Sequence, residues 1–392
     1  MATVILKPDQ GQRIYSGYPR VFNYQISQIK GDFKPGDIVS VTNSRSEFVG
    51  RGYINPGSNI PVRILTHDDE PINKEFLTRR IKQAIDFRKN IISEDTNAYR
   101  LIFSESDFLS GLIVDVYGDC LVIQMLTLGM ENQKQDIIDI LKEFIKPKGI
   151  YLRNDTPLRL QENLSLEKKV VCGRFGTKLE IRENGVPFVV DIENGQRTGF
   201  YIDRRDNRLL LKEITKGKTV LDCFCYSGAF SVYASRYGAS KVVGIDISAH
   251  ALKFAKTNMK LNRINSRRYE FKEDDVFNAL RDLCDRRAKF DVVMLDPPSL
   301  VSSKNKIDSG LRGYRELNLR ALTLLNRGGI LVTSSCSYPV HDQLFKQVLQ
   351  EVADKEGRML RVIKSGSQSP DHPKFLNIKE NSYLKCLVLE VL

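Results

Sequence analysis

Residues 1–66 carry short strand-like apolar stretches between turn signals, and apolar and polar side chains alternate in the first of them. The stretches are 21–26, 38–41, 47–54 and 61–65, with Lys34-Pro-Gly-Asp37 and Asn55-Pro-Gly-Ser58 between successive ones. Proline and glycine at such places favour the backbone angles of tight turns. So many short strands in so few residues predict a small β-barrel over residues 1–70.

Residues 71–190 mix helical and strand periods, which predicts a central α+β domain. Apolar residues recur at helical spacing over 73–92. Strands are expected on both sides of Gly118-Asp119, a hairpin signal, followed by a helix at about 131–145. Glu183-Asn-Gly185 predicts a further turn between strands. The remaining positions of the first helix form a basic face, which we interpret as solvated, with phosphate contact as the alternative: Arg79, Arg80, Lys82, Arg88 and Lys89.

From about residue 191 the pattern changes to short apolar runs that alternate with amphipathic helices. This alternation predicts a mostly parallel, doubly wound α/β sheet, a Rossmann-like domain over 191–392. The expected helices include 249–262 and 311–326. The expected strands are 219–222, 241–246, 269–272, 290–296 and 329–334.

Charge favours an anionic partner. The chain of 392 residues holds 60 Lys and Arg against 48 Asp and Glu, a net charge of +12. Residues 191–392 alone hold 34 basic and 24 acidic residues, so most of the excess lies there. Such an imbalance is typical of nucleic-acid-binding proteins, although many basic proteins bind nothing anionic.

Composition excludes several classes of protein. No stretch approaches the roughly 20 apolar residues of a membrane helix, and the N-terminus lacks the pattern of a signal peptide. Seven cysteines at irregular spacings argue against a disulfide framework and favour the reducing cytoplasm. No Cys or His spacing suits zinc, so no metal is expected.

The segment after the first strand of the predicted sheet, Asp222-Cys-Phe-Cys-Tyr-Ser-Gly228, is rich in small residues that allow a ligand close to the backbone. It has neither the G-x-G-x-x-G of dinucleotide folds nor the phosphate loop of nucleotide triphosphatases. Ligands of such sheets bind beyond the carboxyl ends of the strands. This segment is therefore a candidate donor loop.

Aspartates end the next two strands. Asp246 ends the second strand, where a carboxylate can accept hydrogen bonds from both ribose hydroxyls, and Asp274-Asp275 ends the third, near an adenine amine. Each aspartate alone is more typical of a helix cap. Together they predict an adenosyl pocket, and hence S-adenosylmethionine, whose methionine end Thr198 and Tyr201 would cover. The predicted donor-binding residues are Thr198, Tyr201, Asp222, Cys223, Phe224, Ser227, Gly228, Asp246, Ile247, Asp274, Asp275, Val276, Asp296 and Pro297.

Asp296-Pro-Pro-Ser299 closes the fourth strand. Two prolines stiffen the backbone and remove N–H donors, which makes a rigid lip beside the donor methyl group. With an aromatic in fourth place, this motif suits methylation of an exocyclic amine. Here the fourth residue is Ser299, which cannot stack on a base.

Cys336 follows the fifth strand in Ser-Ser-Cys-Ser-Tyr. Carbon 5 of a pyrimidine is a poor nucleophile, and addition of a thiolate at carbon 6 makes it reactive. A lone cysteine is usually an inert core residue. Its place at a strand end of a methyltransferase frame favours Cys336 as a nucleophile.

The chain resembles, along its whole length, the class I S-adenosylmethionine-dependent 23S rRNA 5-methylcytosine methyltransferases that carry an N-terminal PUA domain. The order of the motifs is more specific than any one of them. The motifs are 191–206, 221–228, 290–298, 312–318, 335–337 and 371–373.

This resemblance implies a PUA barrel, a central RNA-facing domain and a Rossmann-like methyltransferase domain. It implies that Cys336 is the nucleophile, that ribosomal RNA is the partner and that the protein forms a homodimer. Many RNA 5-methylcytosine methyltransferases carry a second cysteine after the motif IV proline, where this chain has Pro298-Ser299. Asp296 is then a candidate for the base that removes the carbon 5 proton.

Two other functions stay open at the level of sequence. One is methylation of an exocyclic amine of guanine or adenine in RNA by Asp296-Pro-Pro-Ser, which makes Cys336 dispensable. The other is an RNA-binding assembly factor with a vestigial donor site, which predicts no donor binding.

Overall fold

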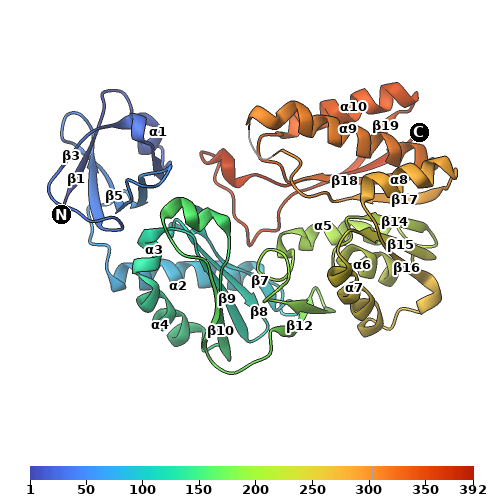
Figure 1. Cartoon of the computed structure of the whole chain (residues 1–392), viewed down its shortest axis with the longest axis horizontal. Coiled ribbons are helices and arrows are strands. Elements are labelled where there is room, and N and C mark those ends of the chain that lie inside the picture. Colours follow the sequence, from blue (N-terminus) through green and yellow to red (C-terminus); the bar gives the residue numbers. More distant parts are fainter. Residues whose placement is uncertain (302–303) are drawn as a thin grey trace. The chain divides into compact units, whose positions relative to one another are not determined.

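The computed structural model describes residues 1–301 and 304–392, whose contacts separate two units (Figure 1). The first unit contains Met1–Leu179, Asp191–Gly199 and Pro370–Asn381, and the second contains Glu180–Val190, Phe200–Ser369 and Ser382–Leu392. The chain therefore crosses between the units several times. The division into three domains at residues 70 and 190 stays a prediction.

The first unit begins with a six-stranded sheet in the order β2-β6-β5-β4-β1-β3, as expected of a small β domain. Alternate strand residues such as Val4, Val39 and Val41 fill its core. The elements are β1 (Thr3–Leu6), α1 (Gln12–Tyr15), β2 (Arg20–Val21), η1 (Asn23–Gln25), β3 (Ile26–Lys30), β4 (Ile38–Thr42), β5 (Phe48–Ile54) and β6 (Val62–Thr66).

The prediction of one strand over residues 21–26 is wrong. β2 ends at Val21, and the 3-10 helix η1 turns the chain before β3 begins at Ile26. The side chain of Gln25 accepts a hydrogen bond of 2.9 Å from the backbone N–H of Phe22. That local bond replaces a ladder bond, which is why alternation alone misjudged this segment.

The rest of the first unit holds a five-stranded sheet, β11-β10-β9-β8-β7, with α2 and α4 packed on it around one apolar core (Figure 1). The predicted hairpin is confirmed, because β8 and β9 pair antiparallel around Gly118-Asp119. The elements are α2 (Lys74–Ile91), β7 (Ala98–Phe103), η2 (Ser104–Asp107), β8 (Leu112–Tyr117), β9 (Cys120–Met125), α3 (Leu128–Asn132), α4 (Lys134–Ile145), β10 (Gly149–Asn154), η3 (Pro157–Glu162) and β11 (Glu167–Cys172).

The helix predicted over 73–92 is confirmed as α2, with the side chain of Asn73 capping its first turn. Its basic face needs one correction. Arg88 is only 1% exposed and donates 2.5 Å and 2.8 Å hydrogen bonds to Asp107. A buried carboxylate therefore holds Arg88 inside the fold, where it contacts neither solvent nor phosphate.

Buried carboxylates also tie the N-terminal sheet to the rest of the first unit. Glu105 accepts hydrogen bonds from Arg20 at 3.0 Å and Arg63 at 3.3 Å, and the Tyr53 hydroxyl donates to the Ser110 carbonyl at 2.7 Å. Burial by itself would raise the pKa of Glu105, but the two arginines outweigh it and lower that pKa to about 2. Both arginines are thus already engaged in ion pairs within the protein.

The second unit is built on a seven-stranded sheet in the order β16-β15-β14-β17-β18-β20-β19. β14 to β18 run parallel to one another, and β20 pairs antiparallel with both β18 and β19. The strands are β14 (Thr219–Cys223), β15 (Lys241–Asp246), β16 (Tyr269–Glu273), β17 (Phe290–Leu295), β18 (Leu325–Ser335), β19 (Leu360–Gly366) and β20 (Lys385–Val391). The mostly parallel sheet expected from the sequence is confirmed.

Helices connect the parallel strands and cover the sheet (Figure 1). α8, α9 and α10 share one apolar core with strand residues such as Leu221, Val293 and Leu331. The connecting helices are α6 (Ala229–Arg236), α7 (Ala249–Leu261), α8 (Val276–Asp285), α9 (Ile307–Leu324) and α10 (Asp342–Glu356). Because each crossover helix returns the chain to the same end of the sheet, all five parallel strands finish at one edge.

A two-stranded ribbon, β12 (Lys178–Glu183) and β13 (Val186–Asp191), precedes this sheet. The predicted turn is confirmed, since Asn184 and Gly185 join the two strands with φ angles of 48° and 71°. Short helical turns follow: η4 (Ile202–Arg204), α5 (Arg205–Leu209) and η5 (Leu210–Glu213). Arg208 of α5 donates to both carboxylate oxygens of Glu183, at 2.7 Å and 2.6 Å.

Candidate active site

The strand register brings the predicted motifs to the same edge of the sheet. Cys223 pairs with Ile245 on one side and with Leu295 on the other, and Leu295 pairs with Thr333. The residues that directly follow this row are the donor loop, Asp246, the Asp-Pro-Pro-Ser segment and the segment that leads to Cys336. Motifs more than 100 residues apart in sequence therefore converge.

The donor loop is a tight series of turns. Phe224, Tyr226 and Gly228 have left-handed φ angles of 63°, 48° and 75°. Two bonds fasten the loop to β15: the N–H of Cys225 donates to the Ile245 carbonyl at 3.0 Å, and the N–H of Tyr226 donates to Asp246 at 2.8 Å. The loop is therefore held in one shape by the neighbouring strand.

Asp222 and Cys223 lie beneath this loop. Asp222 is buried and accepts a 2.6 Å hydrogen bond from the Ser231 hydroxyl. Burial raises the pKa of Asp222 to about 7, although the Ser231 hydrogen bond opposes the shift. The side chain of Cys223 belongs to the apolar core. Both residues therefore support the loop from inside the sheet.

Asp246 is half-buried and uses its carboxylate to organise backbone. Beside the Tyr226 bond, it accepts a 2.9 Å hydrogen bond from the N–H of Ser248, while the adjacent Ile247 is 70% exposed. Asp246 thus lies between the donor loop and the start of α7. An exposed apolar side chain next to a carboxylate is a combination that suits a nucleoside, with one apolar face and ribose hydroxyls.

The residues after β16 have separate local roles. Asp274 forms a 2.7 Å ion pair with Lys272, whose hydrogen bond lowers the pKa of Asp274. Asp275 caps α8 through the N–H of Asn278, and the side chain of Val276 packs into the core. The N–H of Asp274 donates to the Asp246 carbonyl at 3.1 Å, which keeps this segment at the same edge.

Thr198 and Tyr201 lie in different units. Thr198 belongs to the first, where its hydroxyl donates to Asp115 at 2.6 Å and shares a 2.9 Å hydrogen bond with Tyr117. Tyr201 belongs to the second and packs edge-on against Tyr226 of the donor loop, with ring centroids 5.3 Å apart. The structure joins Tyr201 to the donor loop, whereas a donor-binding role for Thr198 stays a prediction.

The donor loop also presents an unused polar atom. Within the described residues, the hydroxyl of Ser227 is buried and has no hydrogen-bond partner. Buried polar groups are almost always paired, so this hydroxyl is suited to a polar group of a bound ligand. Together with Asp246, Ile247 and Tyr201 it fits an adenosyl donor. S-adenosylmethionine would be held by these residues.

Asp246→Ala should weaken binding of S-adenosylmethionine by about 1–3 kcal/mol, because ribose hydroxyls would lose their acceptor and the donor loop its anchor. Titration calorimetry on the full-length protein measures this change. Asp282→Ala, on the exposed side of α8, is the matched control and should bind as the wild type does. Unchanged affinity in the Asp246 variant would remove this carboxylate from the site.

Asp296 is anchored by a buried arginine. Arg204 donates to the two Asp296 oxygens at 3.1 Å and 3.4 Å and to Asp203 at 2.5 Å, and Tyr383 donates to Asp203 at 2.8 Å. Burial opposes the charge of Arg204, but Asp203 and Asp296 outweigh burial and raise its pKa. The position of Asp296 beside Pro297 is therefore set by an ion pair.

Cys336 is half-buried directly beyond β18, and its thiol lies 3.8 Å from the Pro297 carbonyl. Hydroxyls fix the segment that carries it. The Ser337 hydroxyl accepts a bond from the N–H of Val301 at 3.1 Å and lies 2.9 Å from the Tyr314 hydroxyl and 3.0 Å from that of Ser299. The thiol thus lies beside Pro297, and hydrogen bonds of the Ser337 side chain fix the backbone segment that carries it.

Three residues beside Cys336 were not assigned a role from the sequence: Arg204, Tyr314 and Lys385. Arg204 and Tyr314 lie in motifs that carried the resemblance, but periodicity says nothing of their partners. Lys385 interrupts an apolar C-terminal run, Leu384 to Leu392, which predicts a buried strand. A lysine in such a strand is the signal that could have singled it out.

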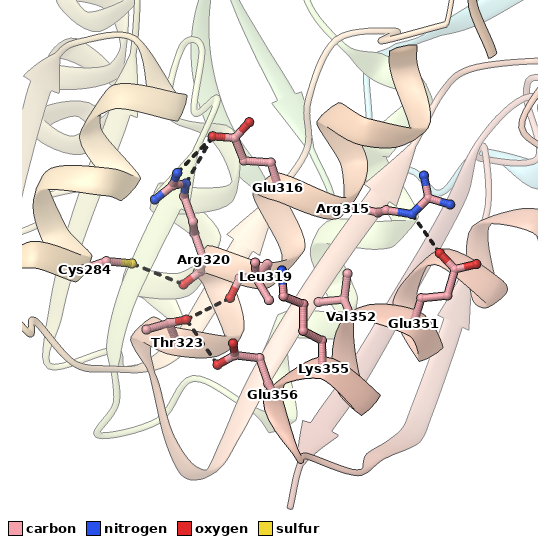
Figure 2. Close-up of a pocket in the computed structure, with 10 residues that line it drawn as sticks. All are labelled: Cys284, Arg315, Glu316, Leu319, Arg320, Thr323, Glu351, Val352, Lys355 and Glu356. Atoms are coloured by element: carbon pink, nitrogen blue, oxygen red, sulfur yellow. Dashed lines mark hydrogen bonds and ion pairs between the residues drawn. The ribbon is translucent and has the colours of Figure 1, made fainter. Parts of the chain in front are cut away.

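A pocket of about 420 Å³ lies elsewhere, between α8, α9 and α10 (Figure 2). The second half of α9 lines it. This half of the helix leads to the start of β18, the end of the strand opposite to the edge that carries the donor loop. Two ion pairs line the pocket, with Arg315 2.7 Å from Glu351 and Arg320 3.0 Å from Glu316. This pocket is therefore separate from the predicted donor site.

Within the part of the chain that the structure describes, no group of three or more His, Cys, Asp or Glu residues is placed to hold a metal ion. Among the same residues, no helix has the length and apolar character needed to cross a membrane. All seven cysteines are free thiols.

Two family models match the chain. One, described as S-adenosylmethionine-dependent methyltransferase, matches residues 165–390, and the other, described as PUA-like domain, matches residues 4–67. The first match contains almost all of the seven-stranded sheet that carries the predicted donor site. The second contains almost all of the six-stranded N-terminal sheet, for which RNA binding is predicted.

Relatives match nearly the whole chain. The protein named ribosomal RNA large subunit methyltransferase I is 38% identical in Pseudoalteromonas atlantica and 36% identical in Escherichia coli (strain SMS-3-5 / SECEC), with 99% of each chain covered. A solved methyltransferase complexed with SAH covers both chains fully with a TM-score of 0.87 at 20% identity. A SAM-dependent methyltransferase from Streptococcus mutans gives 0.86 at 20%, and both show a shared fold. The chain thus belongs to the family of S-adenosylmethionine-dependent methyltransferases, with S-adenosylmethionine as the methyl donor.

Proposed function

We propose that this protein methylates carbon 5 of a cytosine in large-subunit (23S) ribosomal RNA. The choice of RNA rests on the relatives, which are named ribosomal RNA large subunit methyltransferase I. The choice of carbon 5 rests on one observation: a half-buried thiol, Cys336, lies 3.8 Å from the carbonyl of Pro297 at the edge where the donor loop ends. Methylation of an amine would need no thiol there.

The chemistry follows from the residues at that edge. S-adenosylmethionine supplies a methyl group to carbon 5. The Cys336 thiolate forms a bond to carbon 6 of the cytosine, and the electron pair of the 5,6 double bond then makes carbon 5 nucleophilic. After methylation, Asp296 takes the carbon 5 proton, the double bond re-forms and the Cys336 thiolate leaves. Asp296 is our candidate base because it precedes Pro297 at the same lip.

One thiol serves both addition and release in this scheme. Ser299, which stands where many related enzymes carry a second cysteine, has its hydroxyl 3.0 Å from the Val301 carbonyl and 3.0 Å from the Ser337 hydroxyl. Both contacts belong to the support of the Cys336 segment. We therefore assign Ser299 a structural role.

We infer that the PUA-like sheet contributes to RNA binding and that the protein acts in the cytoplasm as a homodimer. Arg20 forms an ion pair with Glu105, and Arg63 forms ion pairs with Glu105 and Glu162, so both are poor candidates for phosphate contacts. The exposed basic residues of the sheet, such as Lys30, Lys34 and Arg45, are better ones. Sedimentation of the purified protein checks the dimer.

An alternative is methylation of an exocyclic amine by Asp296-Pro-Pro-Ser299, which the proline lip favours. The two reactions leave different products. We expect nucleoside mass spectrometry of large-subunit RNA treated with the protein and labelled donor to find the label in 5-methylcytosine. Label in an N-methylated guanine or adenine would establish the amine reaction. A protein that binds RNA but neither donor nor label would instead be an assembly factor.

A further inference from the structure

Lys385 is the first residue of β20, directly opposite Ser335 of β18 in the antiparallel register. It is only 8% exposed. Its ammonium donates hydrogen bonds to the carbonyl of Ser337 at 2.9 Å and to the carbonyl of Tyr383 at 2.8 Å. The first of these carbonyls belongs to the residue that follows Cys336, so the charge lies against the segment that carries the thiol.

This buried ammonium has no carboxylate in direct contact with it among the described residues. Among the residues that the structure describes, Lys385 forms no ion pair with a carboxylate, and its two acceptors are neutral carbonyls. A buried charge costs free energy unless an opposite charge compensates it. Burial lowers the pKa of Lys385 to about 8, and the negative charge that Cys336 and Asp342 can carry acts in the opposite direction. The site therefore favours an anion nearby.

Arg204, the other cation beside Cys336, has no unbalanced positive charge to offer the thiolate. It is paired with both Asp203 and Asp296, so its positive charge is more than balanced. Tyr314 also lies close to the thiol, but its hydroxyl is taken up by Ser335 and Ser337. The carboxylate of Asp342, at the start of α10, also acts on Lys385, but it forms its own ion pair with Lys346 at 2.6 Å. The unbalanced positive charge beside Cys336 is that of Lys385.

We propose that Lys385 is a positioning residue that stabilises the thiolate of Cys336. The buried ammonium, held by the Ser337 and Tyr383 carbonyls, offsets the negative charge that forms when the thiol loses its proton to water. No other bond changes in this step. The same charge favours departure of the thiolate when the 5,6 double bond re-forms. This inference rests on the proposed function of Cys336 as the nucleophile.

The rate of thiol alkylation against pH tests the inference without any need for methyl transfer. The full-length protein is treated with iodoacetamide between pH 6 and pH 10, and mass spectrometry follows the peptide that contains Cys336. Lys385→Gln keeps N–H donors and removes the charge, whereas Lys385→Arg keeps the charge. Lys364→Met, on the neighbouring strand β19, is the control for loss of a lysine. Cys172 and Cys284, also half-buried, are internal references.

We expect Lys385→Gln to move the midpoint of Cys336 alkylation upward by about one pH unit, and to slow alkylation at pH 7 about tenfold. Lys385→Arg and Lys364→Met should keep the wild-type midpoint, and Cys172 and Cys284 should react at wild-type rates in all variants. Should Lys385→Gln fail to fold, Lys385→Met, which retains the apolar stem, replaces it.

If Lys385→Gln or Lys385→Met folds and keeps the wild-type midpoint of Cys336 alkylation, the inference is overturned. Lys385 would then only link the Ser337 and Tyr383 carbonyls by hydrogen bonds. The same holds if Lys385→Arg shifts the midpoint as far as Lys385→Gln does. The role of Cys336 in the reaction is decided separately. If alkylation shifts as expected but Cys336→Ala still methylates RNA, the coupling of Lys385 to the thiol stands and the proposed nucleophile is rejected.

Discussion

Cys336→Ala should reduce methyl transfer by at least about 10³-fold, while the protein stays folded and binds the donor with wild-type affinity. The physical reason is that carbon 5 of cytosine becomes nucleophilic only after a thiolate has added at carbon 6. A methyl side chain offers no substitute. Transfer of label from S-adenosylmethionine to large-subunit RNA measures the effect.

The chain offers a matched control. Cys284 is also half-buried, and its thiol lies 3.8 Å from the Arg320 carbonyl, the same distance that separates Cys336 from the Pro297 carbonyl. It lies on α8, away from the converging strand ends. Cys284→Ala should therefore leave activity unchanged. If both alanine variants retain activity, the carbon 5 mechanism is wrong.

RNA that carries 5-fluorocytosine should trap the intermediate. Fluorine at carbon 5 cannot be removed as a proton, so the bond between the Cys336 sulfur and carbon 6 persists after methylation. The adduct should require the donor, survive a denaturing gel and map to Cys336 by peptide mass spectrometry. Absence of an adduct from an active preparation would contradict covalent catalysis.

Arg208→Ala should lower the stability of the second unit by about 3–5 kcal/mol, the usual effect of removing one partner of a buried ion pair. Arg208 is 1% exposed and donates to both oxygens of Glu183, whose carbonyl in turn accepts a 2.9 Å hydrogen bond from Tyr233. Alanine leaves the buried Glu183 carboxylate without the guanidinium that donates to both of its oxygens. The ribbon of β12 and β13 should open first.

A chain of two units need not unfold in one step, so hydrogen exchange resolved by peptide is the suitable measurement. Protection should fall in peptides from 180–190 and 200–213. Lys364→Ala is the control, because its ion pair with Glu213 is exposed and screened by solvent and should contribute little to stability. Replacing both partners, as Glu183→Gln with Arg208→Met, should recover much of the loss. An Arg208→Ala effect as small as the control's would contradict a stabilising role for the pair.

The elements were well predicted where local pattern decides them. The parallel sheet, α2, and the turn at Asn184-Gly185 follow from periodicity and turn chemistry, and the structure confirms them. The convergence of the donor loop, Asp246, Asp296 and Cys336 follows as well, because parallel strands joined by crossovers must end at one edge. The sequence was thus sufficient to predict the fold class, the family and the order of the donor loop, the Asp-Pro-Pro-Ser segment and Cys336 along the chain.

The partners of individual side chains were decided by tertiary structure alone. Helical spacing places Arg88 on a basic face, but Asp107 draws it into the interior. Gln25 breaks a stretch that alternates like a strand. Arg204 meets Asp296 across 92 residues of chain, and Lys385 meets Ser337 across 48. Periodicity reports which face of an element is apolar, whereas these contacts depend on which elements pack together, and that packing sets the charges around Cys336.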